Sequence, residues 1–455
     1  MAWSTKGFQG ITGPLKERLI QQGLERRARR SERGLAEDLD ANGGDDAIPN
    51  RGNGSDESCR FDLDPAYQQL RLVGEGAARL GISNPFFRPH DGIAGNTTVI
   101  AGQTYINFSS YNYLGLSGHP LVSAAAKQAI DDYGTSVSAS RLVSGERPIH
   151  RALEEALARL HGVDDCITFV SGHATNVTTI GVLCGPGDLV LHDSLIHNSI
   201  LQGIALSKAK RLSFPHNDWA AADRLLSEIR GQFRRVLIII EGLYGMDGDV
   251  PDLPQFILVK LRHHALLMVD EAHSFGVLGA RGLGIREHFG VDGGAVDIWM
   301  GTLSKALAGC GGYIAGGRVL TELLKCSAPG FVYSVGMAPP LAAASLAALA
   351  VLQAEPERVA RLRERAQLFF ELVKRCRIDV GLSQGLSIVP VITASSIKAA
   401  RLADALFRRG INVQPIVYPA VNERAARLRF FLSCEHTEDQ IRAAVDALAA
   451  ALRTL

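Results

Sequence analysis

Short apolar runs rich in β-branched residues alternate with amphipathic stretches from near residue 60 onward. The stretches between the runs, such as 149–160 and 220–230, repeat their apolar positions with the period of a helix. Apolar strands separated by helices are typical of parallel sheets covered on both faces. The pattern therefore predicts an α/β fold with a mainly parallel central sheet. Its predicted strands cover residues 166–170, 189–192, 236–241, 266–270 and 298–301.

The alternation of strands and helices ends near residues 353–358, and the pattern beyond is typical of a smaller α+β domain. The elements predicted there are a charged helix over 357–377, strands at 387–392 and 427–433, and helices around 396–409 and 437–453. The whole chain is predicted to contain a charged, flexible leader (1–57), an N-terminal segment packing on the small domain (58–116), a large domain (117–350) and a small C-terminal domain (351–455).

An Ala-rich run, 341–352, is the longest smooth apolar stretch of the chain. It follows Pro339 and Pro340, which favour a helix start, and it is far shorter than the roughly 20 residues that span a bilayer. We therefore predict a buried helix and no membrane span. The N-terminus lacks the apolar core of a signal peptide. The seven cysteines include no CxxC pair and no metal-ligand spacing, which predicts free thiols, a cytoplasmic location and no bound metal.

Charge is balanced over the chain but divided within its first residues. Lys plus Arg is 48 and Asp plus Glu is 47, so the net charge of +1 offers no field to attract nucleic acid or an anionic membrane. A basic block at 16–33 precedes an acidic block at 37–57. One interpretation is a solvated leader. The other is a docking arm for an acidic carrier protein, formed by Arg26, Arg27, Arg29 and Arg30.

Polar residues follow the ends of the predicted strands. Because the ligand site of an open α/β sheet lies beyond the carboxyl ends of its strands, we expect these residues to share one crevice. They are Ser171, Gly172 and His173 after the first strand, Asp193 and His197 after the second, Asp270 and His273 after the fourth, and Thr302 and Lys305 after the fifth.

This set of residue types suits pyridoxal 5′-phosphate. Lys305 can be the Schiff-base partner of the cofactor, and Asp270 can hold the ring nitrogen protonated. His197 can stack on the ring, and amides at the turn with Gly172 can bind the phosphate. Each residue also has a structural explanation, because Asp270 can cap a helix, Lys305 can be a surface lysine and His197 can be a core histidine. The set in this order is more specific than any member.

The sequence VDEAH, which contains Asp270, also resembles the Walker B strand of DEAH-type helicases. A nucleotide-driven motor would need GxxxxGK[ST] upstream, and the chain contains neither GKS nor GKT. A dinucleotide-binding site is disfavoured for a similar reason, because no GxGxxG follows an early strand.

From about residue 80 to its C-terminus the chain resembles the α-oxoamine synthases, pyridoxal-phosphate enzymes of fold type I. The segments YNYLG and SASR look most like serine palmitoyltransferase and related synthase domains of polyketide pathways. The motifs that carry the resemblance are NFSSYNYLGL (107–116), TSVSASRLVSGE (135–146), FVSGHATN (169–176), HDSLIHNSILQG (192–203), EGLYGMDGD (241–249), VDEAHSFGVLG (269–279), GTLSKALAGCGG (301–312) and RLRFFLS (427–433).

The resemblance implies a role for each matching residue. Lys305 would form the Schiff base, and Asp270 would pair with the ring nitrogen. His197 would stack on the ring, and His273 would hydrogen-bond the phenolic oxygen of the cofactor.

The resemblance also implies phosphate and substrate contacts. Arg429 would bind the carboxylate of the amino acid, with Asn112 nearby, since arginine pairs with carboxylates through two hydrogen bonds. The phosphate would be bound by the amides of Gly172 and His173, the hydroxyl of Thr302 and, from the partner subunit's side of the site, Ser334.

Three positions depart from the family pattern. Gly245 stands where the family usually has a serine that touches the cofactor or the thioester carbonyl. His173 stands where a phenylalanine or tyrosine is common, and Gly336 stands where many relatives have a second hydroxyl. The functions of those hydroxyls are therefore open in this chain.

The implied reaction is a decarboxylative condensation of glycine, alanine or serine with an acyl thioester, giving an α-amino ketone, carbon dioxide and a free thiol. The acyl donor is either coenzyme A or an acyl carrier protein, and the charged leader favours the carrier. The resemblance also implies a homodimer with its active site at the subunit interface. The alternatives are an aminotransferase of the same fold type, an acyl-CoA-specific synthase, and a non-enzymatic partner subunit, which would typically lack Lys305.

Overall fold

The computed structural model describes residues 59–455 of the chain, so the predicted leader and its arginines lie outside the described residues. Two compact units are formed. The large unit contains residues 90–390 and 430–446, and the described part of the small unit contains 59–89, 391–429 and 447–455. The units therefore interleave along the chain. The predicted domain boundaries remain a sequence-based prediction.

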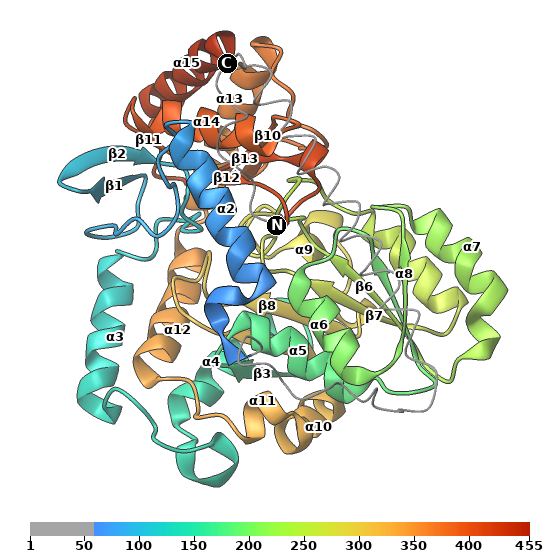
Figure 1. The fold of residues 1–455 in the computed structure, drawn as a ribbon. Coiled ribbons are helices and arrows are strands. Elements are labelled where there is room, and N and C mark those ends of the chain that lie inside the picture. Colours follow the sequence, from blue (N-terminus) through green and yellow to red (C-terminus); the bar gives the residue numbers. More distant parts are fainter. Residues whose placement is uncertain (1–58) are drawn as a thin grey trace. The chain divides into compact units, whose positions relative to one another are not determined.

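A seven-stranded sheet forms the centre of the large unit, in the order β3-β9-β8-β7-β6-β4-β5 (Figure 1). The neighbours from β8 to β5 pair in parallel, whereas β9 runs antiparallel to both β3 and β8. The predicted mainly parallel sheet is thus confirmed. Its strands are β3 (Asp165–Phe169), β4 (Leu189–Asp193), β5 (Lys210–Phe214), β6 (Val236–Glu241), β7 (Leu266–Asp270), β8 (Ile298–Thr302) and β9 (Gly312–Gly316).

Helices cover both faces of this sheet because its strands are apolar on both sides. On one face Ile239 and Met268 belong to a buried cluster that includes residues of α5, α6, α10 and α11. On the other face α4 packs on β3 and α8 packs on β7. Burying one such side chain contributes about 1.5–3 kcal/mol. These helices are α4 (Pro148–His161), α5 (Gly172–Leu183), α6 (Asn198–Ser207), α8 (Leu253–Arg262), α10 (Arg318–Ser327) and α11 (Pro329–Val332).

The Ala-rich run forms the predicted buried helix, α12 (Pro339–Ala354), which packs against α3 (Pro120–Tyr133) and α4. Among the described helices, none combines the length and the apolar character that a membrane crossing needs. The remaining elements of the large unit include α7 (Trp219–Ile229), α9 (Ile285–Phe289), α13 (Glu357–Arg375) and the hairpin of β1 (Thr97–Ile100) with β2 (Gln103–Asn107).

Residues in the last segment of the large unit hold a loop that lies near the beginning of the same unit in the sequence. The Phe431 N–H donates to the carbonyl of Phe108 at 2.9 Å, and the Cys434 N–H donates to the carbonyl of Tyr113 at 2.8 Å. Residues close to the C-terminus are therefore required to fix the loop around Tyr113.

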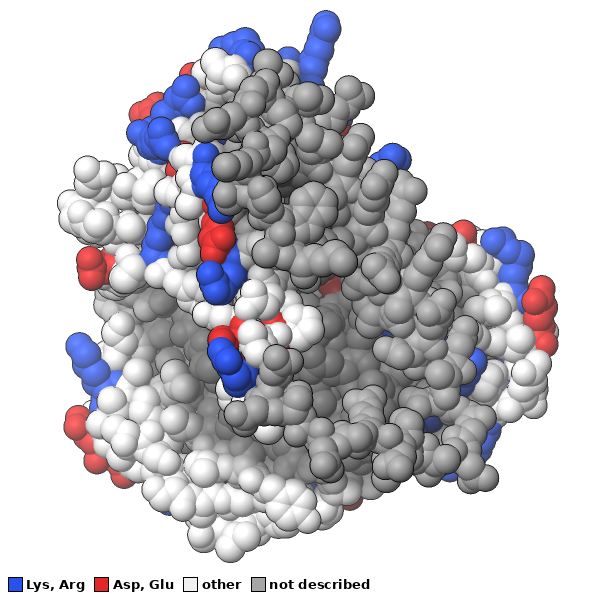
Figure 2. Space-filling view, in the orientation of Figure 1, with Lys and Arg blue, Asp and Glu red and all other residues white. Residues whose placement is uncertain are grey.

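The small unit is built around the sheet β10-β13-β12. The side chain of Glu423 accepts from the Ser396 N–H at 2.8 Å and so satisfies a donor at the start of α14. Acidic and basic side chains lie next to one another over α2 in Figure 2. On this helix Arg71 forms an ion pair with Glu75. The elements that lie wholly or partly in this unit are α2 (Pro65–Arg79), β10 (Ile388–Ile392), α14 (Ser396–Phe407), β11 (Ile411–Asn412), β12 (Gln414–Ile416), β13 (Arg427–Phe431) and α15 (Glu438–Thr454).

Candidate active site

Asp270 is a buried carboxylate at the carboxyl end of β7, with 4% of its surface exposed. One oxygen accepts from Asn176 Nδ2 of α5 at 3.0 Å, and the other accepts from the Ala272 N–H at 2.9 Å. Both donors are neutral, and within residues 59–455 Asp270 forms no ion pair with a lysine, arginine or histidine. Hydrogen bonds therefore stabilise the carboxylate of Asp270 without an opposite charge beside it, which favours the binding of a cationic ligand group.

A line of hydrogen bonds connects Asp270 to His197. Asn176 Nδ2 also lies 3.0 Å from Ser199 Oγ, which in turn lies 2.7 Å from His197 Nδ1. His197 is the N-cap of α6, and its Nδ1 accepts from the Ser199 N–H at 3.3 Å. Because Nδ1 accepts, the neutral ring carries its proton at Nε2. The structure thus joins two of the predicted site residues through two that the sequence did not reveal.

His273 follows β7 and is 9% exposed. Its Nδ1 lies 2.8 Å from the hydroxyl of Tyr113, a fully buried residue of the YNYLG segment. The opposite side of the ring packs on the backbone of Gly245, where an added Cβ would lie 2.4 Å from His273 Nε2. A side chain at position 245 would therefore collide with the imidazole of His273 as it lies in this structure.

Lys305 follows β8 and is half-buried. Its Nζ lies 5.6 Å from the ring centroid of Tyr111, whose ring in turn meets His273 edge-on at 6.1 Å. Tyr111 is 40% exposed and was not predicted as a site residue. Its place in the YNYLG segment could have identified Tyr111 from the sequence, since an exposed aromatic residue in a predicted functional motif is a candidate for ligand contact.

Glu241 is a second carboxylate that the sequence interpretation did not assign. It ends β6, pairs in register with Asp270 and is 6% exposed. Burial and the neighbouring charge of Asp270 raise the pKa of Glu241, so its neutral form is favoured. Its Oε2 accepts from the Gly245 N–H at 3.4 Å. Two adjacent strand ends thus carry buried carboxyl groups, and the neutral form of Glu241 is favoured.

The predicted phosphate-binding residues Gly172 and Thr302 lie against each other. A Cβ at Gly172 would lie 2.9 Å from Thr302 Oγ1, which itself donates to the Gly311 carbonyl at 2.9 Å. Gly172 and the exposed His173 begin α5, where the first N–H groups have no partner within the helix. A glycine is needed here because the helix start approaches the end of β8 so closely.

Asn112 and Arg429 are placed by backbone contacts. Asn112 Nδ2 donates to the Ala94 carbonyl at 2.9 Å, and Asn112 Oδ1 accepts from the Ser117 N–H at 3.2 Å. Both ends of this amide therefore hold the loop that carries Tyr111 and Tyr113. Arg429 lies on β13 in the small unit, opposite Gln414 of β12.

Ser334 and Gly336 follow α11. Ser334 Oγ donates to the Val335 carbonyl at 3.2 Å. The Gly336 N–H donates to the Ala139 carbonyl at 3.0 Å, and an added Cβ would lie 2.8 Å from Arg141 Cγ. The second family hydroxyl is missing at Gly336 because the side chain of Arg141 occupies its place.

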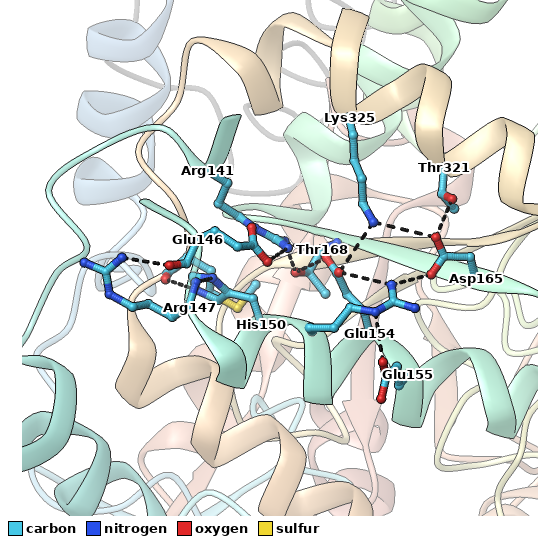
Figure 3. Close-up of polar contacts among 12 residues, drawn as sticks. Arg141, Glu146, Arg147, His150, Glu154, Glu155, Asp165, Thr168, Thr321 and Lys325 are labelled. Carbon is cyan, nitrogen blue, oxygen red and sulfur yellow. Dashed lines mark hydrogen bonds and ion pairs between the residues drawn. The ribbon is translucent and has the colours of Figure 1, made fainter. Parts of the chain in front are cut away.

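Arg141 is the centre of a network of buried charges (Figure 3). Its guanidinium lies 2.7 Å from a carboxylate oxygen of Glu146 and 2.5 Å from one of Glu154, and the side chains of Arg141 and Glu154 are 3% and 0% exposed. The cations thus neutralise the buried carboxylates. We call this group the Arg141 network; its members are Arg141, Glu146, Arg151, Glu154, Asp165, Thr168, Thr321 and Lys325.

A cavity of about 320 Å³ lies at the opposite edge of the sheet, next to the first residues of β6 and β7. Its basic lining is already engaged, because Arg230 donates to the carbonyls of His263 and Phe233 and Arg234 pairs with Asp188. This cavity is not the predicted site. Within the described part of the chain, no group of three or more His, Cys, Asp or Glu residues is arranged to hold a metal ion.

The residues at the carboxyl edge fit pyridoxal 5′-phosphate. Asp270 offers a buried carboxylate without a cationic partner for a protonated ring nitrogen, and Lys305 supplies an amine after the end of the next strand. At the start of α5, the backbone of Gly172 and the hydroxyl of Thr302 lie close together, as a phosphate-binding site requires. We call Asp270, Asn176, Ser199, His197, His273 and Lys305 the carboxyl-edge site.

Comparison with known proteins identifies the family. A profile described as aminotransferase class I and II matches residues 103–448. The 8-amino-7-oxononanoate synthase of Symbiobacterium thermophilum is 40% identical over 358 residues, which is 79% of this chain and 91% of that protein. That of Geobacter sulfurreducens is 41% identical over 361 residues, with the same coverage of 79% and 91%. This chain belongs to the α-oxoamine synthase family.

Solved structures of α-oxoamine synthases share the fold. Serine palmitoyltransferase from Sphingomonas wittichii has a TM-score of 0.82 and 28% identity, covering 86% of this chain and 98% of that chain. The 8-amino-7-oxononanoate synthase of Francisella tularensis has a TM-score of 0.65 and 28% identity, covering 77% and 98%. Another solved serine palmitoyltransferase, with a TM-score of 0.81, contains pyridoxal phosphate.

The predicted family, fold type and cofactor are therefore confirmed: the chain is a pyridoxal-phosphate-dependent enzyme of the α-oxoamine synthase family. The roles of its individual site residues remain predictions, supported by the geometry described above.

Proposed function

We propose that the carboxyl-edge site of this synthase joins an amino acid to an acyl thioester. The α-carbon of the amino acid attacks the thioester carbonyl, the thiol leaves, and the resulting β-keto acid loses carbon dioxide to give an α-amino ketone. The observation that carries this proposal is Asp270, a buried carboxylate that ends β7 and is held by neutral donors only, while Lys305 follows the end of the neighbouring strand β8.

Asp270 and His197 are proposed to hold the cofactor ring. Pyridoxal phosphate, when bound, supplies an electron sink for the negative charge that develops on the α-carbon of the amino acid. The carboxylate of Asp270 keeps the ring nitrogen protonated, because an unneutralised buried anion favours an adjacent cation. Asn176 and Ser199 orient both side chains through their hydrogen bonds.

Lys305 is proposed to move the reacting proton. Its amine takes the proton from the α-carbon of the bound amino acid and later returns one to the same carbon after carbon dioxide has left. Tyr113 holds His273 through the 2.8 Å contact at Nδ1, so that His273 can hydrogen-bond the phenolic oxygen of the cofactor.

Substrate binding is assigned to the predicted carboxylate and phosphate contacts. Arg429 binds the carboxylate of the amino acid, since a guanidinium and a carboxylate pair through two hydrogen bonds. Asn112 acts through the loop that it holds, because its amide is bonded to two backbone groups. The helix start at Gly172 and the hydroxyl of Thr302 bind the phosphate.

A homodimer is proposed on the basis of exposed apolar residues. Leu142, Val143, Tyr333 and Val335 are 53%, 81%, 86% and 50% exposed. The loops that carry them are joined, because Ser140 Oγ donates to the Val332 carbonyl at 2.6 Å. Exposed apolar residues gathered in this way are typical of an interface between chains. Sedimentation of Val143→Asp should show a shift to monomer, whereas Leu261→Asp, on an exposed position of α8, should not change the assembly.

The free thiols of all seven cysteines support a cytoplasmic enzyme. The acyl thioester is common to both proposed donors, coenzyme A and an acyl carrier protein, and the assay must separate them. Carbon dioxide release should be measured for glycine, alanine and serine with matched acyl-CoA and acyl carrier substrates. Amino-group transfer without carbon dioxide release would contradict the proposal and favour an aminotransferase.

The assignment of Lys305 has a direct chemical test. Borohydride reduction of the loaded enzyme should fix the cofactor to the peptide that contains Lys305, and Lys305→Ala should abolish this labelling. A variant without Lys305 that still turned over normally would show that the assignment is wrong.

A further inference from the structure

Three loops at the carboxyl edge of the sheet meet at His216, which follows β5. His216 Nδ1 lies 2.9 Å from Asp193 Oδ1 at the end of β4, and His216 Nε2 lies 2.9 Å from Asp249 Oδ2 in the loop after β6. The three side chains are 11%, 0% and 7% exposed. Neither the sequence analysis nor the proposed reaction gives His216 a role.

Asn217 reinforces the same connection. Its backbone N–H donates to Asp193 Oδ2 at 2.7 Å, and its Nδ2 donates to Asp249 Oδ2 at 2.6 Å. Asn217 has φ of +55°, a left-handed conformation that asparagine tolerates better than most residues. Two consecutive residues thus hold both carboxylates.

The ring of His216 can contact both carboxylates only as a double donor, which means as an imidazolium. Burial opposes the charged form, but the hydrogen bonds and charges of Asp193 and Asp249 raise the pKa of His216 to about 10. The other titratable group that faces the ring is Tyr244, which packs edge-on at 4.5 Å. At neutral pH the ring of His216 is therefore a cation that connects the two carboxyl groups.

The two loops held by His216 lead directly to the carboxyl-edge site. Asp193 accepts from the Leu195 N–H at 2.8 Å and begins the turn that ends at His197. Asp249 closes the loop that contains Gly245, since the Asp249 carbonyl accepts from the Tyr244 N–H at 3.0 Å. Gly245 in turn packs on the ring of His273.

We propose that His216 is a positioning residue for the cofactor: by joining Asp193 to Asp249 it fixes the loops that place His197 and His273. This inference rests on the proposed function of the carboxyl-edge site. If His216 acts in this way, its loss should weaken cofactor binding more than it lowers the stability of the fold. A contact with a purely structural role would not have this effect.

The chain offers a matched control in His263. This histidine is also buried and lies 2.8 Å from the carboxylate of Asp223, but it follows α8 at the opposite edge of the sheet. Replacing either residue by glutamine removes a buried imidazole and a contact with a carboxylate. Only His216→Gln should act on the loops of the site.

The experiment compares cofactor-free His216→Gln, His263→Gln and unaltered protein. Titration with pyridoxal phosphate should show a dissociation constant raised about 10-fold or more by His216→Gln, the usual cost of losing support behind a ligand-holding residue. His263→Gln should stay within about twofold of the unaltered protein. Circular dichroism of the bound cofactor should be reduced in His216→Gln alone, because the signal reports the fixed orientation of the ring.

Unchanged cofactor affinity and circular dichroism in a folded His216→Gln would overturn the inference. If that variant does not fold, Asn217→Ala, which removes only the Nδ2 contact with Asp249, decides by the same measurements. Borohydride labelling of Lys305 in the unaltered protein keeps the two proposals apart. Loss of that labelling contradicts the proposed function, whereas normal labelling with unchanged affinity in the variants contradicts only the role of His216.

Discussion

The Arg141 network and the carboxyl-edge site both bury carboxylates in the large unit, but they treat the charge differently. In the Arg141 network, Glu154 meets Arg141 at 2.5 Å and Asp165 meets Arg151 at 2.5 Å (Figure 3). At the carboxyl-edge site, Asp270 receives hydrogen bonds from neutral donors only. In the first region, cations of the protein neutralise the carboxylates, whereas in the second Asp270 has no ion-pair partner among residues 59–455.

This difference separates a structural network from a binding site. A buried charge that is paired with an opposite charge of the protein contributes nothing to ligand binding. It lowers the stability of the fold only when its partner is removed. A buried charge that the protein leaves without a cation costs folding free energy, and that free energy is recovered when a cation binds. Mutations in the Arg141 network should therefore change mainly the stability of the fold. Mutations at the carboxyl-edge site should change mainly cofactor binding.

The largest effect on stability is expected from Arg141→Met. Removing the guanidinium takes away the closest cation of the buried Glu154 and leaves only Arg151 at 3.8 Å and Lys325 at 3.9 Å, which costs up to about 3–5 kcal/mol of the free energy of unfolding. Urea unfolding of the cofactor-free protein measures this loss. Arg151→Met is the matched control, because its side chain is 43% exposed and its loss should cost about 1 kcal/mol or less. Equal losses in both variants would contradict the comparison.

Asp270→Asn should affect activity and stability in opposite directions. The turnover number should fall by about 10²–10³, the usual cost of removing one preorganised electrostatic contact. The cofactor-free variant should be at least as stable as the unaltered protein, since a buried anion without a cation has been removed. Steady-state kinetics and thermal unfolding measure the two quantities. A marked loss of stability in the cofactor-free variant would show that Asp270 belongs with the structural charges.

Gly245→Ser tests whether the site tolerates the hydroxyl that its relatives usually carry. The new Cβ would lie 2.4 Å from His273 Nε2, and such overpacking typically costs about 1–3 kcal/mol. The expected result is weaker cofactor binding and lower turnover, measured by titration and steady-state kinetics. Gly231→Ser is the control, because nothing lies within 4 Å of its added Cβ. A gain of activity in Gly245→Ser would contradict the packing explanation.

A further comparison concerns the pH dependence of stability. Because the pKa of His216 is raised from 6.5 to about 10, its protonation stabilises the fold fully below pH 6.5, and this contribution is lost as the pH rises through about 10. The difference in free energy of unfolding between the unaltered protein and His216→Gln should therefore shrink over that range.

His161 provides the comparison for this titration. Burial lowers its pKa from 6.5 to about 3, so above about pH 7.5 the ring is neutral in both the folded and the unfolded chain. The stability difference for His161→Gln should be constant above that pH. A parallel pH dependence for both variants would contradict the charged state assigned to His216.

Most of the parallel sheet was predictable from the sequence, because continuous apolar runs such as Val236–Glu241 and Leu266–Asp270 have few alternatives to a buried strand. β5 and β9 were not predicted. Lys210–Phe214 is a polar edge strand, and Gly312–Gly316 is rich in glycine, which lacks the side chains on which strand patterns depend.

Site residues were predictable from the sequence only where a reactive side chain follows the end of a predicted strand. Asp270 and Lys305 follow apolar runs directly, so the topology alone brings them to one edge. Asn176 and Ser199 lie within helices, and they join His197 to Asp270 only after α5 and α6 have packed. Such contacts depend on tertiary packing, which no local pattern contains. Gly245 was noticed as a departure, but its contact with the ring of His273 is visible only in the structure.

The segment that ends the large unit has a consequence for the order of events during synthesis. The loop carrying Tyr113 receives a hydrogen bond from Cys434, which the ribosome adds after all seven strands of the central sheet have been made. Because the chain is synthesised from its N-terminus, every strand of this sheet is present before the bond that fixes the loop can form. Newborn chains should therefore acquire the orientation of His273, which Tyr113 secures, only after release of the last residues.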